Sequence, residues 1–257
     1  MLELKSIYKN YNPGTVNEMC LFDDFNLIVP DGQFVAVVGS NGSGKTSMLN
    51  IICGSIQADR GEILVNGENI TNERDYQRHR TIGRVYQDPS KGTCPSMNIL
   101  ENMSIADNKG KIFGLQAGVN HKRKDYYRDL LKSLGLGLED KLYTKVGSLS
   151  GGQRQAVALL MSTMTPLEFL ILDEHTAALD PKTADIIMEL TDKIVREKKV
   201  TTIMVTHNLR YATEYCDRLL MMHEGSIILD KSGEDKKKMK PEEIMHLFNE
   251  ISVECGN

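Results

Sequence analysis

Apolar residues in this chain recur with two different spacings. Strand-like segments alternate apolar and polar residues, or are apolar throughout, and turn residues bound each of them. They span residues 2–7, 26–29, 33–38, 62–65, 81–86, 169–172, 201–205, 218–223 and 226–230. Three stretches, 34–38, 169–172 and 203–205, are almost continuously apolar, which is typical of central parallel strands covered on both faces.

Helical patterns lie between these strand-like segments. They span residues 45–53, 122–134, 151–164, 182–197 and 209–215. The alternation of strands and helices predicts an α/β core with a parallel sheet. Residues 88–150 carry helical patterns and no convincing strand, so we expect a helical insertion there. The core of a single domain, residues 1–230, would then comprise residues 1–87 and 151–230.

Residues 231–257 read as a separate terminal segment. A mixed charge run at residues 234–238 comes first, and Pro241 then opens an amphipathic pattern. The apolar positions of that pattern are Ile244, Leu247, Phe248 and Ile251. We interpret the segment as a charged, solvated linker followed by a packed C-terminal helix, with a regulatory contact as the alternative.

Composition excludes some classes of protein. The 257 residues can bury a substantial core, and 31 Lys and Arg against 35 Asp and Glu give a net charge of −4. A nucleic-acid partner is not expected, because such proteins usually carry a basic surface. The 5 cysteines show no C-x-x-C spacing, and their odd number cannot pair fully within the chain, so we expect reduced thiols. They are Cys20, Cys53, Cys94, Cys216 and Cys255.

The sequence offers no candidate membrane span. Its longest runs without charge, residues 32–44 and 155–167, are rich in glycine or polar side chains and fall short of the roughly 18 apolar residues that a span needs. The first residues alternate apolar with charged side chains and lack the layout of a signal peptide. We therefore expect a cytoplasmic location.

Residues 39–46 match the phosphate-loop pattern G-x-x-x-x-G-K-[ST], directly after an apolar strand and before a helix. They are Gly39, Ser40, Asn41, Gly42, Ser43, Gly44, Lys45 and Thr46. The glycines let backbone N–H groups surround phosphate oxygens, and the helix presents its positive end to the same anion. Lys45 can reach the β- and γ-phosphates, the Thr46 hydroxyl suits Mg²⁺, and Ser47 joins the candidate nucleotide contacts. A chance match in a glycine-containing turn is the alternative, and the strand–loop–helix context argues against it.

Two adjacent acids, Asp173 and Glu174, end the apolar strand at residues 169–172. At a strand exit both side chains can line the crevice at the carboxyl end of the sheet. The first carboxylate can hold Mg²⁺ through water, and the second can polarise an attacking water as general base. Such a pair is usually solvated surface, but the complete phosphate loop favours the catalytic interpretation.

The segment Leu149-Ser-Gly-Gly-Gln decides which kind of phosphate-loop protein this is. Ser150 is a good helix N-cap, and the following helix has an apolar face, so its N-terminus forms a second anion site. An ordinary capped helix is the alternative. LSGGQ upstream of the two acids resembles the signature of the ABC ATPases, and five ordered motifs extend the resemblance over about residues 2–230. It implies a P-loop NTPase core with a mostly parallel sheet, an antiparallel β edge and an inserted α-helical subdomain.

In that family the signature of one subunit closes over the γ-phosphate held by the phosphate loop of the other. The resemblance therefore implies a head-to-tail dimer that encloses two ATP molecules. The signature residues with this role are Ser150, Gly151, Gly152 and Gln153.

Four further residues take their roles from the resemblance. Tyr11 matches the aromatic residue that stacks on adenine, although a packed core tyrosine is the alternative. Gln87 matches the glutamine that touches Mg²⁺ and water, and Asp180 matches the acid that approaches the partner subunit. His207 matches the histidine that hydrogen-bonds the γ-phosphate; otherwise it would be an unexceptional residue at a strand end.

The chain departs from the commonest family pattern just after the acids. His175 stands where most members have proline, and Ala177 where serine or threonine is frequent. We still expect hydrolysis, with a less rigid and titratable loop. Residues 173–183, with 190–197 and 221–225, resemble a bacterial subgroup that accompanies a binding protein and one kind of permease subunit, in systems assigned to tryptophan or tyrosine uptake.

The resemblance thus implies a Mg²⁺-dependent ATPase subunit that energises import of an aromatic amino acid. Its implied partners are a second copy of itself, integral membrane permease subunits and an extracytoplasmic binding protein, which would place it on the inner face of the membrane. An exporter subunit is one alternative. A non-transport ABC ATPase is another, but those carry tandem nucleotide domains or long coiled coils, and this chain has one motif set and no sustained heptads.

Overall fold

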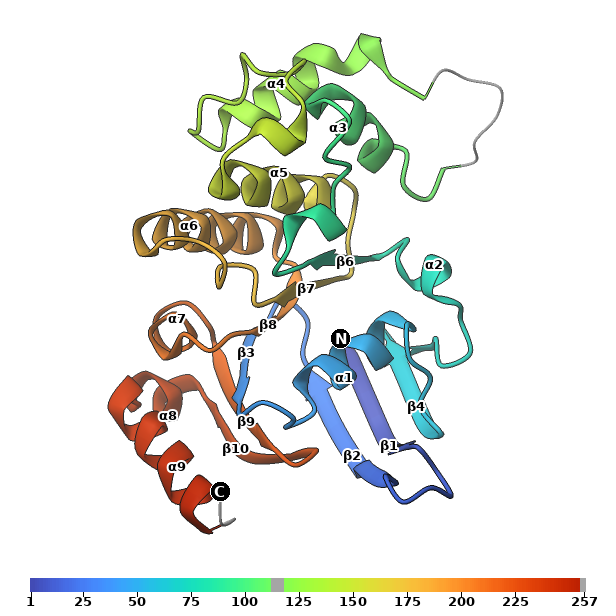
Figure 1. Cartoon of the computed structure of the whole chain (residues 1–257), viewed down its shortest axis with the longest axis vertical. Helices are drawn as coiled ribbons and strands as arrows, with labels where there is room; N and C mark the ends of the chain where they lie inside the picture. The colour runs from blue at the N-terminus through green and yellow to red at the C-terminus, as the bar shows by residue number, and fades with distance from the viewer. Residues whose placement is uncertain (112–117, 255–257) are drawn as a thin grey trace. The chain divides into compact units, whose positions relative to one another are not determined.

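The structure, a computed structural model, describes residues 1–111 and 118–254, with side chains described as far as residue 247. The chain forms two compact units (Figure 1). The first combines Met1–His79 with Lys199–Asn257, and the second is Arg80–Lys198. The phosphate loop belongs to the first unit, and both the acidic pair and the LSGGQ segment belong to the second.

The first unit opens with an antiparallel sheet of strand order β2-β1-β4-β5. Its strands are β1 (Leu2–Tyr11), β2 (Met19–Val29), β4 (Arg60–Val65) and β5 (Glu68–Asn69). Leu2 is paired with Val29 on one side and with Val65 on the other, and all three side chains are buried. The expected antiparallel β edge is therefore confirmed.

A second sheet in the first unit carries the phosphate loop. Here β3 (Phe34–Gly39) lies between β8 (Thr201–Val205) and β9 (Arg218–His223) and runs parallel to both. β10 (Ser226–Ser232) pairs antiparallel with β9 at the edge. All residues of β3 and β8 are buried, as the apolar runs at residues 34–38 and 203–205 predict for central strands.

Helices complete the first unit. They are α1 (Lys45–Cys53), α2 (Asp75–Arg78), α7 (Leu209–Glu214), α8 (Gly233–Lys238) and α9 (Pro241–Glu254). The charged run read as a linker forms helix α8, because the buried Lys236 donates a hydrogen bond to the carbonyl of Thr213 near the C-terminal end of α7. In α9, Ile244 is fully buried, while the side chains of Phe248 and Ile251 lie outside the described residues.

The second unit holds a parallel pair of strands and four α-helices among its described residues. The strands are β6 (Ile82–Val85) and β7 (Phe169–Asp173). The helices are α3 (Ile99–Asp107), α4 (Lys124–Lys132), α5 (Gly151–Thr163) and α6 (Pro181–Lys198), with 3₁₀ turns at Pro89–Lys91, His121–Arg123 and Val146–Ser148. In the described parts of residues 88–150, the β pairing is a single bridge between Asn98 and Lys145.

Two polar contacts, one buried and one partly buried, anchor α3 and the residues just after it inside the second unit. The hydroxyl of Tyr127 in α4 donates a 2.8 Å hydrogen bond to Oδ2 of Asp107, the last residue of α3. Just beyond α3, Nζ of Lys109 donates a 3.1 Å hydrogen bond to the carbonyl of Ile82 in β6. Burial lowers the pKa of the Lys109 amine to about 8.

Two expectations concern the chain as a whole. Cys20, Cys53, Cys94 and Cys216 are free thiols, and Cys255 lies outside the described residues. Across residues 1–111 and 118–254, no helix combines the length and the apolar character that crossing a bilayer requires.

Candidate active site

The phosphate loop connects the buried strand β3 to helix α1 in the first unit. Gly39 ends the strand where the loop passes close to β9, and a Cβ atom there would lie 2.3 Å from the carbonyl oxygen of Met222. Only glycine fits that approach. Gly44 is the N-cap residue of α1 and has no side chain that could compete with an anion for the first N–H groups of the helix. The local structure is thus built to receive phosphate.

Lys45 places its positive charge inside this loop. The residue is only 5% exposed, and its Nζ donates hydrogen bonds to the carbonyls of Gly39 at 2.8 Å and Ser40 at 2.7 Å. Thr46 follows with an exposed side chain, and Ser47 is half-buried. The ammonium, the helix N-terminus and two hydroxyls therefore gather at the first turn of α1, where they can neutralise and orient a polyphosphate.

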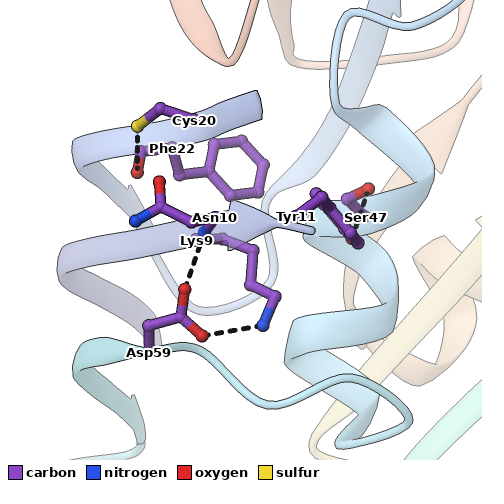
Figure 2. A network of polar contacts seen from close by, with 7 residues as sticks. All are labelled: Lys9, Asn10, Tyr11, Cys20, Phe22, Ser47 and Asp59. Carbon is purple, nitrogen blue, oxygen red and sulfur yellow. Dashed lines mark hydrogen bonds and ion pairs between the residues drawn. The ribbon is translucent and has the colours of Figure 1, made fainter. Parts of the chain in front are cut away.

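Tyr11 lies beside this helix, as Figure 2 shows. Its hydroxyl donates a 3.1 Å hydrogen bond to Oγ of Ser47 in α1, so the aromatic residue from β1 reaches the phosphate-loop helix within one unit. Nζ of Lys9 lies 5.7 Å from the ring centroid. Asp59 fixes that strand end by accepting hydrogen bonds from Nζ of Lys9 at 2.8 Å and from the backbone N–H of Asn10 at 2.6 Å. The structure thus places Tyr11 beside the phosphate-loop helix, and its stacking on adenine stays a prediction.

His207 follows β8 at the same end of the sheet as the phosphate loop. β3 and β8 run parallel with Val37 opposite Val205, so Gly39 and His207 each stand two residues beyond a paired position. The backbone N–H of Thr206 donates a 3.2 Å hydrogen bond to the carbonyl of Val37 and continues the pairing toward His207. The exposed His207 side chain is thus on the carboxyl side of the strands, where ligands bind in open α/β sheets.

The acidic pair lies in the second unit, at the carboxyl end of strand β7. β6 and β7 are parallel with Val85 opposite Leu172, so Gln87 and Glu174 each stand two residues beyond that pair. The backbone of Glu174 is left-handed, with φ of 49°, an uncommon conformation for a residue other than glycine. It turns the chain sharply at the strand exit.

Asp173 has a partner that the sequence interpretation missed. Nη2 of Arg84 in β6 donates a 2.7 Å hydrogen bond to Oδ2 of Asp173, and the Arg84 guanidinium stacks 4.7 Å from the centroid of the Tyr86 ring. A charged residue inside an otherwise apolar strand was the available signal.

The loop after Glu174 differs from expectation. His175 is 2% exposed, and its Nε2 lies 3.0 Å from Oγ1 of Thr191 in α6. Burial lowers the pKa of the imidazole to about 4, so the ring is neutral near pH 7. The prediction of a titratable side chain is therefore wrong near pH 7, because the imidazole is buried and hydrogen-bonded; the lower rigidity of the loop stays a prediction.

The LSGGQ segment forms a capped helix start. Oγ of Ser150 accepts from the backbone N–H of Gln153, and Oε1 of Gln153 accepts from the backbone N–H of Ser150, both at 3.3 Å. The predicted N-cap is thereby confirmed. A Cβ on Gly152 would lie 2.2 Å from Cγ2 of Thr183, so glycine lets α5 pack closely on α6. Gly151 is exposed beside Ser150 at this helix end.

Asp180 begins the next helix of the same unit. Its Oδ1 accepts a 3.1 Å hydrogen bond from the backbone N–H of Thr183 in the first turn of α6. Hydrogen bonds from the Thr183 side chain and backbone hold the pKa of the Asp180 carboxyl below its usual value. The exposed carboxylate is therefore ionised and fixed as a cap; its approach to a partner subunit stays a prediction.

The candidate metal ligands suit Mg²⁺ by chemical type. Thr46, Gln87 and Asp173 offer a hydroxyl, an amide oxygen and a carboxylate, the hard oxygen donors that Mg²⁺ prefers. Asp173 is partly accessible, with 17% of its side chain exposed, and Arg84 contacts its Oδ2. Among the residues that the structure describes, no three or more His, Cys, Asp or Glu side chains form a group that could hold a metal ion.

Comparison with known proteins gives the family. The family model described as ABC transporter matches residues 22–177. The chain is 46% identical to the tyrosine transport ATP-binding protein of Clostridioides difficile (strain R20291), over 96% of this chain and 98% of that protein. It is 30% identical to the phosphonates import ATP-binding protein PhnC 3 of Halalkalibacterium halodurans, over 95% of this chain and 93% of that protein.

Solved structures agree with this result. One is a dimeric ATP-binding cassette in a post-hydrolysis state bound to ADP and Pi, with a TM-score of 0.75, 30% identity, and coverage of 90% of this chain and 98% of that one. An ATP-binding cassette in its ADP conformation gives a TM-score of 0.78 at 25% identity, with coverage of 100% and 99%. The chain belongs to the ABC transporter family, as an ATP-binding domain of its ATP-hydrolysing subunits. The resemblance drawn from the motifs is confirmed.

Proposed function

We propose that this chain energises the import of a small solute, an aromatic amino acid, as the ATP-hydrolysing subunit of a bacterial ABC transporter. Two copies associate head to tail around two ATP molecules, and hydrolysis lets them separate. The observation that carries the proposal is that one chain offers two helix N-termini suited to anions, α1 after the phosphate loop and α5 after Ser150. One bound nucleotide needs only the first.

Each residue of the candidate site has a proposed task. Lys45 and the first N–H groups of α1 bind the phosphates, and Tyr11 stacks on adenine. Glu174 accepts a proton from the attacking water, while His207 donates a hydrogen bond to the γ-phosphate. Thr46, Gln87 and Asp173 hold Mg²⁺, which when bound neutralises charge on the phosphate oxygens.

The names of the relatives support the transport role. The relative with 46% identity is named for tyrosine transport, and others are named for import of phosphonates or of spermidine and putrescine. We infer a permease contact through Gln87 and the segment 88–104, an extracytoplasmic binding protein in the complete system, and a cytoplasmic position on the inner face of the membrane. An aromatic amino acid is the proposed cargo because that relative matches nearly the whole chain.

Hydrolysis and dimerisation are tested together with Glu174→Gln. We expect this variant to bind ATP, to turn it over at least about 100-fold more slowly, and to form an ATP-dependent dimer in light scattering. Lys45→Ala is the control and should lose ATP binding and the dimer together. Normal turnover by Glu174→Gln would refute the base, and a strict monomer with ATP would refute the two-site model.

Import is tested in the assembled transporter. The tagged chain is purified from its native membrane with its associated subunits and reconstituted into vesicles with ATP inside. Uptake of labelled tyrosine or tryptophan that stops in the Glu174→Gln assembly would support the proposal. ATP-dependent loss of these amino acids from preloaded vesicles would identify an exporter, and transport of neither would contradict the proposed cargo.

A further inference from the structure

A buried histidine directly follows the proposed general base. β7 ends at Asp173, Glu174 turns the chain, and His175 points into the unit with 2% of its surface exposed. The turn closes when the backbone N–H of Ala177 donates a 2.9 Å hydrogen bond to the carbonyl of Glu174. The side chain of His175 is therefore packed in the core of the unit, directly after the turn.

The direction of the hydrogen bond to His175 follows from the partner's other contact. Oγ1 of Thr191 donates to the carbonyl of Ile187 at 2.7 Å, and a hydroxyl has one hydrogen to donate. At 3.0 Å from the same oxygen, Nε2 of His175 must therefore be the donor. This assigns the neutral tautomer with the proton on Nε2. The imidazole thus connects the loop to α6 by a hydrogen bond.

Helix α6 is a firm anchor for such a bond. It extends over 18 residues, and Thr191 lies in its interior with 0% exposure, next to the buried Leu190. A hydrogen bond inside this packing is protected from water, and its loss would leave a buried imidazole N–H without an acceptor. The link thus resists displacement of the loop.

The backbone of Glu174 needs such support. A left-handed conformation costs a residue other than glycine roughly 1 kcal/mol, and it persists where the surrounding structure fixes it. Glu174, with φ of 49°, is the first residue of the turn that Ala177 closes, and the buried His175 is the next residue of the same turn. Loss of the hydrogen bond from His175 to Thr191 would let the backbone of Glu174 relax toward a common conformation and redirect its carboxylate.

We propose that His175 is a positioning residue for ATP hydrolysis: its hydrogen bond to Thr191 holds the left-handed turn that aims the Glu174 carboxylate at the attacking water. The inference rests on the proposed role of Glu174 as general base. No proton passes through His175, which acts only through the backbone of its neighbour.

Thr191 gives the sharpest test, because it lies away from the nucleotide residues. Thr191→Val removes the hydroxyl and keeps the shape, whereas Thr191→Ser keeps the hydroxyl. Thr163→Val is the matched control, since Thr163 in α5 is 1% exposed and its Oγ1 also donates to a helix carbonyl, that of Leu159 at 2.9 Å. All three are compared with the parent protein in steady-state ATP hydrolysis and in urea unfolding.

We expect Thr191→Val to lower kcat roughly 10-fold with KM for ATP within about twofold, because small displacements of a catalytic group are costly. Thr191→Ser should hydrolyse ATP at nearly the parent rate, and Thr163→Val should lose stability without losing kcat. His175→Leu, a second removal of the same bond, should match Thr191→Val. Parent kcat in Thr191→Val, an equal loss in Thr163→Val, or no recovery in Thr191→Ser would each overturn the proposal.

A double variant separates this inference from the assignment of the base. If the bond acts through Glu174, Thr191→Val combined with Glu174→Gln should be no slower than Glu174→Gln alone. A further loss of about 10-fold in the double variant would show that Thr191 acts by another route and would overturn the inference. Parent turnover by Glu174→Gln alone would instead remove the proposed base, whatever the Thr191 variants do.

Discussion

Nη2 of Arg84 lies 2.7 Å from Oδ2 of Asp173, and the two side chains are 6% and 17% exposed. They come from neighbouring parallel strands, β6 and β7. The proposed metal ligand thus carries a nearly buried positive partner within its own unit. Withdrawing a carboxylate from water costs free energy that such a partner offsets, and the hydrogen bond from Arg84 orients the Asp173 side chain.

Replacement of Arg84 should therefore destabilise the fold. Arg84→Met leaves a partly buried carboxylate without its counter-charge, and we expect the free energy of unfolding to fall by about 3 kcal/mol in urea titrations. Arg128→Met is the control, because its pair with Asp125 is exposed, and it should change stability by less than about 0.5 kcal/mol. Equal effects of the two substitutions would contradict a structural role for the Arg84 pair.

Tyr11 separates nucleotide affinity from hydrolysis. Tyr11→Ala removes the ring, and we expect KM for ATP to rise roughly 10-fold with kcat nearly unchanged, since stacking of a base on an aromatic ring contributes about 1–3 kcal/mol. Tyr11→Phe keeps the ring and loses only the 3.1 Å contact with Ser47, so KM should stay within about threefold. A packed core tyrosine would instead show a loss of stability with an unchanged KM, measurable by steady-state kinetics beside urea unfolding.

Elements with a strong local pattern could be predicted from the sequence. Helix α1 and strands β8 and β9 begin and end at the predicted residues, because apolar runs and turn residues bound them. The outer half of β1, beyond Ile7, was missed. It carries polar and half-buried residues without alternation, and pairing with β2, with its register shifts, holds it in place.

Contacts between distant residues were beyond prediction from sequence. The motifs named Asp173 and Glu174 but not Arg84, which lies 89 positions from Asp173, and nothing local marks Thr191 as the partner of His175. For His175 the sequence showed an unusual residue after the acidic pair, but whether its imidazole is charged or neutral near pH 7 depends on its burial. Chemistry carried by a contiguous motif is readable from the chain, whereas chemistry that depends on packing requires the fold.

Lys109 should make stability depend on alkaline pH. Its amine has a folded-state pKa of about 8, below the ordinary lysine value of 10.5, because burial disfavours the charged form. Between pH 8 and 10.5 the unfolded chain binds a proton that the folded chain has lost, so stability rises with pH by up to about 3 kcal/mol. Lys109→Met should lack this rise. Parallel curves for the two proteins in urea titrations from pH 7 to 10.5 would exclude the effect.

A matched pair of substitutions can separate the role of Ser150 as a helix cap from its proposed role at the nucleotide. Asn and Asp cap helices about as well as Ser, so Ser150→Asn and Ser150→Asp should both unfold within about 0.5 kcal/mol of the parent. Ser150→Ala should lose about 1 kcal/mol with its half of the capping box. These values come from urea unfolding and check that α5 is intact.

The rate of ATP hydrolysis should differ between Ser150→Asn and Ser150→Asp. In a head-to-tail dimer, the charge of Ser150→Asp would face the partner's γ-phosphate and repel it, while Ser150→Asn brings no charge. We expect ATP turnover by Ser150→Asp to be at least about 10-fold below that of Ser150→Asn, with the ATP-dependent dimer lost in the background of Glu174→Gln. If α5 were only an ordinary capped helix, the two variants would hydrolyse ATP equally, because their caps are equivalent and no phosphate would lie near the added charge.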